Sequence, residues 1–348
     1  MITIRHACIK TLGLVLASAL AGGVQAQEKT LTVSAPGGSF EQWLRKDVFP
    51  AFTAKTGVKI TYVVASATDL LAKLQAQKGN QQIDVGMLDD GPMYQATDLG
   101  FCGDLAPAPI YNNVYDNMKL KSNKGVFFGV VATGFTYNKK VFDENKWPAP
   151  TTWADMWDPK YKKKLVVFPL NSTYGVHALV MAARMKGGSE TNIEPGFKAF
   201  KDDIGPNVLA YEASPAKVTE LFQSGQAVIA VYGNGRTKSL ADTGFPAEFV
   251  YPKEGGVALA FGACPIVGTK NEKEAQAFIQ FLLTPEAQIS LAKGVGFAPV
   301  NRTVKLSAEE QRGVPTGEQL QNLKVVDWNT INQNRADWNK RWTREIER

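Results

Sequence analysis

The chain has 348 residues, of which 44% are hydrophobic and 21% charged, and its formal net charge is +6. This composition is ordinary for a globular protein, with no low-complexity block or internal repeat. The positive excess is modest and dispersed. Its densest cluster, Lys160 to Lys164, is typical of a solvated loop rather than a nucleic-acid-binding stripe, so we expect no nucleic-acid partner.

The first 26 residues have the pattern of a secretory signal peptide. Arg5 and Lys10 precede an apolar run from Leu12 to Ala21, and the small-residue triplet Val24-Gln25-Ala26 follows. We expect cleavage after Ala26. The run is shorter than the roughly 20 residues of a membrane span, which favours an exported chain without membrane insertion. A retained N-terminal anchor is the alternative.

Removal of this leader leaves more residues than one hydrophobic core usually supports, which favours two lobes. Cys102 and Cys264 would then be the remaining cysteines, either as a disulfide or as two buried thiols. His177 would be the remaining histidine. This scarcity argues against a multi-histidine zinc site, and we expect no metal and no cofactor.

Strands and helices alternate from Thr30 onward. The pattern predicts strands at 31–35, 58–65 and 83–88, and helices at 40–56 and 68–79, with Ser39 as the cap of the first helix. Further strands are predicted at 129–138, 165–168, 227–232 and 248–252, and helices at 174–185 and 272–283. This alternation indicates a parallel α/β architecture. The tail carries Trp328, Trp338 and Trp342 near helical spacing, which predicts that it packs onto the body.

Four blocks of the sequence are distinctive: LTVSAPGGSFEQ (31–42), PTTWADMWDPKYKKKL (150–165), FVYPKEGGVALAFGACPIV (249–267) and EAQAFIQFLLTPEAQISLAKGVGFAPVNR (274–302). They resemble the periplasmic solute-binding proteins of ABC importers, in the subgroup related to spermidine/putrescine-binding proteins. They occur in the expected order over nearly the whole chain after the leader.

The resemblance implies an α/β protein with the two-lobed type II periplasmic-binding-protein fold and a ligand cleft between the lobes. Crossings are implied near 133–138 and 256–265. Lobe 1 would comprise 27–134 and 262–325, lobe 2 would comprise 135–261, and 326–348 would form a helical tail. It also implies a periplasmic monomer that is not an enzyme and that delivers a small-molecule solute to a membrane permease by lobe closure.

The first candidate binding segment is the glycine turn after the first strand. Gly37, Gly38 and Ser39 would let backbone N–H groups approach an anionic oxygen. A capped turn that binds only water is the alternative. Asp89 and Asp90 follow the strand at 83–88, where adjacent acids usually indicate a solvated loop. We expect one of them to cap a helix and favour Asp89 as the partner of an ammonium group.

The third candidate segment follows the strand at 227–232. Tyr232 matches the position of an aromatic residue in polyamine-binding relatives. Arg236 carries a planar guanidinium that suits a carboxylate and would repel a polycation, although an ordinary surface arginine is the alternative.

The departures from the polyamine pattern favour another solute. No carboxylate follows the strand at 165–168, where Ser172 and Tyr174 stand instead, and Phe261 lies in a late crossing that lacks the aspartate of those relatives. We therefore expect a small anionic or zwitterionic solute, such as an amino-acid-like, opine-like or organic-acid compound. Polyamine binding is the alternative; ferric-ion binding through Tyr174 and Tyr232, or an enzyme using His177, is a more distant one.

Overall fold

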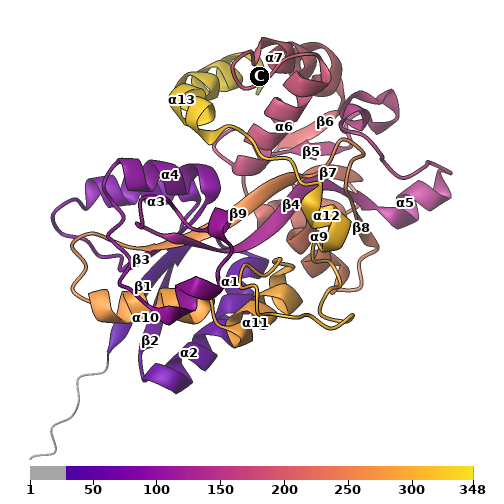
Figure 1. Ribbon diagram of the computed structural model, residues 1–348. Coiled ribbons are helices and arrows are strands. Elements are labelled where there is room, and N and C mark those ends of the chain that lie inside the picture. The colour runs from indigo at the N-terminus through magenta and orange to yellow at the C-terminus, as the bar shows by residue number, and fades with distance from the viewer. Residues whose placement is uncertain (1–28, 348) are drawn as a thin grey trace, which may run out of the picture.

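Two long strands connect two lobes in the computed structural model, which describes residues 29–347 (Figure 1). They are β4 (Val126–Asn138) and β9 (Val257–Pro265), and they pair with each other antiparallel. Through them one nine-stranded sheet continues from lobe to lobe in the order β2-β1-β3-β9-β4-β7-β5-β6, with β8 on β4. The expected signal peptide lies outside the described residues.

The first lobe packs helices around the half of the sheet that holds β1, β2 and β3. Its strands are β1 (Thr30–Ala35), β2 (Lys59–Val64) and β3 (Val85–Asp89). Its helices are α1 (Ser39–Trp43), α2 (Phe49–Thr56), α3 (Ala67–Ala76), α4 (Asp90–Asp98), α10 (Glu272–Leu282) and α11 (Pro285–Val295), with a π-helical turn at Leu44–Val48 and 3₁₀ turns at Pro109–Asn113 and Asp116–Met118. The single helix predicted over 40–56 is thus interrupted by a π turn.

The second lobe is built on the other half of the sheet. Its strands are β5 (Leu165–Val167), β6 (Val208–Tyr211), β7 (Ile229–Gly233) and β8 (Ala247–Val250). Its helices are α5 (Lys139–Glu144), α6 (Thr173–Met185), α7 (Glu194–Ala199), α8 (Pro215–Gln223) and α9 (Asn234–Ala241), with a π turn at Phe200–Ile204 and 3₁₀ turns at Trp153–Trp157, Pro159–Tyr161 and Gly205–Asn207. The short α12 (Gly317–Gln321) and the long α13 (Trp328–Glu345) complete the chain.

The sheet is mixed, which corrects the expectation of a parallel architecture. Within each lobe the strands are parallel: β1 pairs with β2 and β3, and β5 pairs with β6 and β7. The two crossing strands, in contrast, run antiparallel to β3 and β7. They differ because each crossing strand has to run from one lobe into the other, so its direction is set by the connection rather than by a βαβ unit.

The first lobe has one hydrophobic core, and the second has a larger core and a smaller, separate cluster that contains Phe168 and Tyr232. Both crossing strands contribute to the two cores: Val130 and Leu259 pack in the first, and Phe135 and Val257 in the second. All 13 residues of β4 are buried, as expected for a strand covered on both faces. The boundaries predicted for the lobes at 134/135 and 261/262 fall within these shared strands and stay predictions.

Helix α13 lies on the second lobe and reaches the first (Figure 1). Trp328, Trp338 and Trp342 are buried in the second core. At its start, the Trp328 ring lies against α4 so closely that a Cβ on Gly91 would stand 2.4 Å from a ring carbon. Among the described residues, no helix is long and apolar enough to span a membrane.

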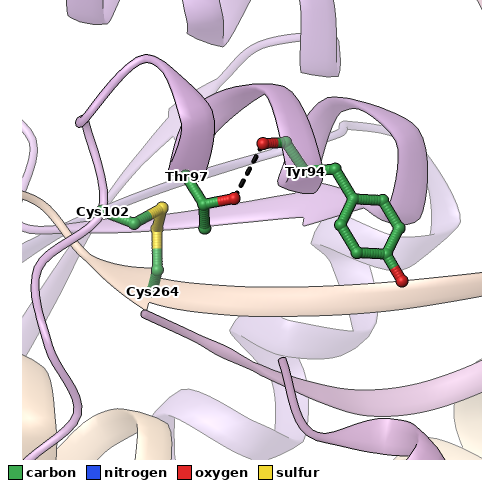
Figure 2. Close-up of a disulfide and its surroundings, with 4 residues drawn as sticks. All are labelled: Tyr94, Thr97, Cys102 and Cys264. Carbon is green, nitrogen blue, oxygen red and sulfur yellow. Dashed lines mark hydrogen bonds between the residues drawn. A yellow bond between two sulfur atoms is a disulfide. The ribbon is translucent and has the colours of Figure 1, made fainter. Parts of the chain in front are cut away.

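A disulfide joins Cys102 to Cys264 (Figure 2), which decides between the two states left open by the sequence. Cys102 follows α4 and Cys264 lies near the end of β9, so the bond connects positions 162 residues apart. It ties the late crossing strand to the early part of the first lobe.

Candidate functional site

A cleft of about 430 Å³ lies between the lobes, at the carboxyl ends of the parallel strands. This is where open α/β sheets usually bind ligands. The wall from the first lobe contains Pro36, Gly37, Gly38, Glu41, Val64, Ser66, Ala67, Asp69 and Asp89. The opposite wall contains Phe168, Asn171, Ser172, Thr173, Tyr174, Ala213, Ser214, Pro215, Ala216 and Arg236, and Leu259 and Phe261 of β9 complete the lining.

The turn after β1 packs tightly against its surroundings. Tyr62 of the neighbouring strand donates from its hydroxyl to the Pro36 carbonyl, 2.7 Å away. Gly38 has φ of 75°, and a Cβ on it would meet Nη1 of Arg236 at 3.0 Å. Glycine therefore allows both the backbone conformation and the close approach of the arginine.

Ser39 does not act as the predicted helix cap. Gly38 occupies the N-cap position of α1, and no side chain caps this end. The Ser39 hydroxyl instead accepts a hydrogen bond from Arg236, so a long-range partner replaces the local one. Ser39 lines two smaller pockets next to the cleft rather than the cleft itself.

Arg236, at the start of α9, joins the two walls. Its Nη1 donates to Oγ of Ser39 over 3.0 Å and its Nη2 donates to the Gly37 carbonyl over 3.1 Å. A guanidinium has five N–H groups, so these contacts leave donors for a solute. The side chain lies at the cleft wall rather than on the outer surface.

The two adjacent acids have different surroundings. Asp89 is half-buried at the end of β3 and lines the cleft; no hydrogen bond or ion pair of its carboxylate occurs among residues 29–347. Asp90 is buried behind the wall and accepts a hydrogen bond from the Gly91 amide at 3.2 Å. Burial, followed by the charge of Asp89, raises the pKa of Asp90 to about 7. The structure thus brings Asp89 to the cleft and leaves Asp90 beneath it.

Three aromatic rings form one wall of the second lobe. Phe168 and Tyr174 line the cleft, and Tyr232 lies behind them with ring centroids 5.5 Å from each. The Tyr232 hydroxyl donates to the Pro215 carbonyl at 3.2 Å, and the side chain is buried. Burial raises the pKa of Tyr174 to about 12, so its phenol stays protonated as a neutral hydrogen-bonding group.

The lobes also touch on the other side of the cleft. The loop after β5 carries Asn171 and Ser172, and the Asn171 carbonyl accepts a bond from Thr68 of α3 at 3.5 Å. The same loop is held from behind by Arg335 of α13. The lining therefore depends on a residue at the far end of the chain.

Sequence reasoning missed two carboxylates of the first lobe. Glu41 lies one helical turn after the glycine turn and forms an ion pair with Arg45, 2.9 Å away. Asp69 follows the carboxyl end of β2 and accepts a bond from Ser66 at 2.7 Å. The rule that ligands bind where parallel strands end would have pointed to the segment after β2. It would not have shown which side chain faces the cleft.

His177, the residue of the rival enzyme hypothesis, does not line the cleft, whereas Tyr174 of the iron hypothesis does and Tyr232 lies behind it. His177 is fully buried and shares a hydrogen bond with Thr133 at 2.8 Å; burial, together with the charges of Arg335 and Arg184, lowers its pKa to about 3. Within the part of the chain that the structure describes, no group of three or more His, Cys, Asp or Glu side chains could hold a metal ion.

A sequence profile of the bacterial extracellular solute-binding proteins matches residues 47–316. The chain belongs to this family. The recognition made from the sequence blocks is thus confirmed, and so is the two-lobed α/β fold.

The names of two relatives include a solute. The spermidine/putrescine-binding periplasmic protein of Salmonella typhimurium is 25% identical over 334 residues, covering 90% of this chain and 92% of the relative. A "Putative 2-aminoethylphosphonate-binding periplasmic protein" of Salmonella typhi is 24% identical over 319 residues, covering 87% of this chain and 88% of the relative. A solved ABC transporter structure from Clostridium perfringens has 25% sequence identity and a TM-score of 0.71, covering 91% of this chain and 99% of that one.

Proposed function

We propose that this member of the solute-binding family is the periplasmic component of an ABC importer and captures a small zwitterionic or anionic solute. The observation that carries the proposal is the placement of Arg236 and Asp89 in one cleft between the lobes. The guanidinium would hold a carboxylate or phosphonate group, and the unpartnered Asp89 carboxylate would hold an amine. Both partners have to be present to take a zwitterion out of water.

The remaining lining residues suit orientation and burial of such a solute. Ser172, Asn171 and the neutral Tyr174 phenol offer hydrogen bonds, and Phe168, Leu259 and Phe261 offer apolar contact. A solute that touches both walls stabilises the closed arrangement of the lobes, which a membrane permease can distinguish from the open one. The reaction class is binding and release; no bond of the solute is changed.

Polyamine binding is the second candidate function, and one feature of the cleft favours it. Three carboxylates, of Glu41, Asp69 and Asp89, line the cleft beside aromatic rings, and a polyamine needs anions and aromatic faces to replace its water. Two of the three already have protein partners, and Arg236 would repel a polycation. We therefore rank it below the zwitterion.

The decisive test is titration calorimetry of the purified chain against 2-aminoethylphosphonate, amino acids, opines, organic acids, putrescine and spermidine. We expect the tightest binding from compounds that carry both an amine and an anionic group. Tight binding of putrescine or spermidine with indifference to the anionic compounds would overturn the assignment. Small-angle scattering with and without the best ligand then measures closure of the lobes.

A further inference from the structure

The C-terminal helix places a buried arginine behind the cleft. Arg335 of α13 is only 4% exposed. Its Nε and Nη2 donate to the Leu170 carbonyl at 3.2 and 3.1 Å, and Nη2 also donates to the Asn171 carbonyl at 3.2 Å. These carbonyls belong to the loop that carries Asn171 and Ser172 into the cleft. Arg335 therefore fixes part of the lining without touching a solute.

The same face of α13 is attached to the first lobe. Asn332, three residues before Arg335, donates from Nδ2 to the Gly91 carbonyl at 2.9 Å. Trp328, seven residues before Arg335, lies against Gly91. Gly91 directly follows Asp89 and Asp90, so this face lies beside the acidic end of β3.

The charge of Arg335 is not neutralised by a contact. Among residues 29–347 its guanidinium bonds to the backbone carbonyls of Leu170 and Asn171 and forms no ion pair with a carboxylate, and its buried Nη1 has no hydrogen-bond partner. Burial lowers the pKa of Arg335, and the charges of Asp89 and Asp90 act in the opposite direction. A charge in such a poorly solvated position acts strongly on neighbouring charges because little water screens it.

The geometry points to Arg335 as a positioning residue that also determines charge specificity: its fixed positive charge behind Asp89 and Asp90 disfavours a second ammonium group in the cleft. This inference rests on the proposed function. The other charged groups of the cleft come from different elements: Glu41 from α1, Asp69 from α3 and Arg236 from α9. Without Arg335, the acidic first-lobe wall would attract a diamine more strongly, whereas an aminophosphonate, whose anionic group offsets its ammonium group, would gain nothing.

The test compares Arg335→Gln, which removes the charge and keeps an amide donor, with Arg335→Lys, which keeps the charge and loses the planar fork. Calorimetry gives the Kd of each variant for putrescine and for 2-aminoethylphosphonate. We expect Arg335→Gln to shift the ratio of the two constants toward putrescine by about tenfold or more. We expect Arg335→Lys to keep the wild-type ratio. Equal changes of both constants, or the same ratio in both variants, would overturn the inference. A residue with only a structural role would change the Kd values for the two solutes by the same factor.

A ligand-free measurement separates this inference from the proposed function. Carboxyl ¹³C NMR follows the titration of Asp90, whose pKa is about 7 in the wild type. Loss of a nearby positive charge in Arg335→Gln raises that pKa further; an unchanged value overturns the inference even if neither probe binds. If Arg335→Gln does not fold, the two Kd values are compared between Asp90→Asn and Asp90→Asn/Arg335→Gln. In this pair position 90 carries a neutral amide, so the loss of the Arg335 charge does not leave a buried carboxylate without a positive charge nearby.

Discussion

Arg236 donates from Nη1 to the hydroxyl of Ser39, 3.0 Å away, although the two residues are 197 positions apart and belong to different lobes. Together with the bond from Nη2 to the Gly37 carbonyl, this contact bridges one side of the cleft without a solute. An anionic group that enters the cleft can use the remaining N–H groups of the guanidinium. The residue proposed to select the solute thus also holds the lobes together.

Replacement of Arg236 tests that dual role. Arg236→Lys keeps the charge but loses the fork that reaches Ser39 and Gly37, so we expect the affinity for 2-aminoethylphosphonate to fall about 10- to 100-fold. Calorimetry measures it. Arg312→Lys is the matched control, because Arg312 is exposed and pairs with Asp242 away from the cleft. Unchanged affinity in Arg236→Lys would contradict the assignment.

Asp89→Asn removes the carboxylate expected to bind an amine while nearly preserving its shape. We expect about a tenfold loss of affinity for 2-aminoethylphosphonate and little loss for ethylphosphonate, which lacks the amine. The exposed Asp104→Asn serves as the control for a general change in surface charge. Equal losses for the two phosphonates would show that Asp89 does not contact the amine.

Asp90 makes stability depend on pH in a defined direction. Its pKa rises from 3.8 in the unfolded chain to about 7 in the folded one, so the folded state binds the extra proton between these values. The free energy of unfolding contributed by this group is fully present below pH 4 and is lost as the pH rises through 7. We therefore expect Asp90→Asn to raise the Tm at pH 8 by several degrees more than at pH 5. Thermal melts of both proteins at both pH values give this difference directly.

The effect of Asp90 has to be measured as the difference in Tm between Asp90→Asn and the wild type, because His177 changes the stability with pH in the opposite direction. Its folded-state pKa of about 3 lies below the unfolded value of 6.5, so its contribution is present above that value and is lost as the pH falls toward 3. The two groups partly offset each other in the wild-type profile. A constant Tm difference between variant and wild type from pH 5 to 8 would argue against the Asp90 prediction.

Gly91→Ala tests the contact between α4 and α13. The added methyl group would stand 2.4 Å from a carbon of the Trp328 ring, so one helix has to move. We expect a loss of about 1–3 kcal/mol in the free energy of unfolding, measured with urea, despite the higher helix propensity of alanine. Gly103→Ala is the control, because its new Cβ would have its nearest neighbour at 3.6 Å. If Gly91→Ala and Gly103→Ala lost the same free energy of unfolding, the effect would come from adding a methyl group in general and not from the contact with Trp328.

The disulfide gives a fifth prediction. Cys102→Ala/Cys264→Ala opens a long covalent loop, and we expect a loss of about 2–5 kcal/mol in the free energy of unfolding. A reductant added in the urea titration should lower the stability of the wild type and leave the double variant unchanged. An equal response of both proteins would show that the bond does not form in solution.

Much of the fold was predictable because it depends on local patterns. The strand, glycine turn and helix around Gly38 follow from short-range periodicity and backbone freedom, and β3 with Asp89 at its end follows from the same reasoning. The bond between Ser39 and Arg236 could not be predicted, since a serine at the start of a helix is typical of an N-cap residue and the sequence does not show which partner its hydroxyl takes. Arg335 was missed for a related reason: on a polar helix its burial is visible only once α13 is docked onto the loop after β5. The antiparallel crossings depended on lobe connectivity, which periodicity does not encode.

The two cores are assembled from segments that are distant in the chain. The first needs Leu291 and Val300 beside Leu31, and the second needs Trp338 and Trp342 beside Phe135. A polypeptide that emerges from the ribosome or a translocation pore with its N-terminus leading exposes incomplete apolar surfaces until its last helix arrives. Truncation by a few turns at the C-terminus should therefore leave this protein dependent on chaperones, and it would also remove Arg335, which holds the loop after β5 from behind the cleft.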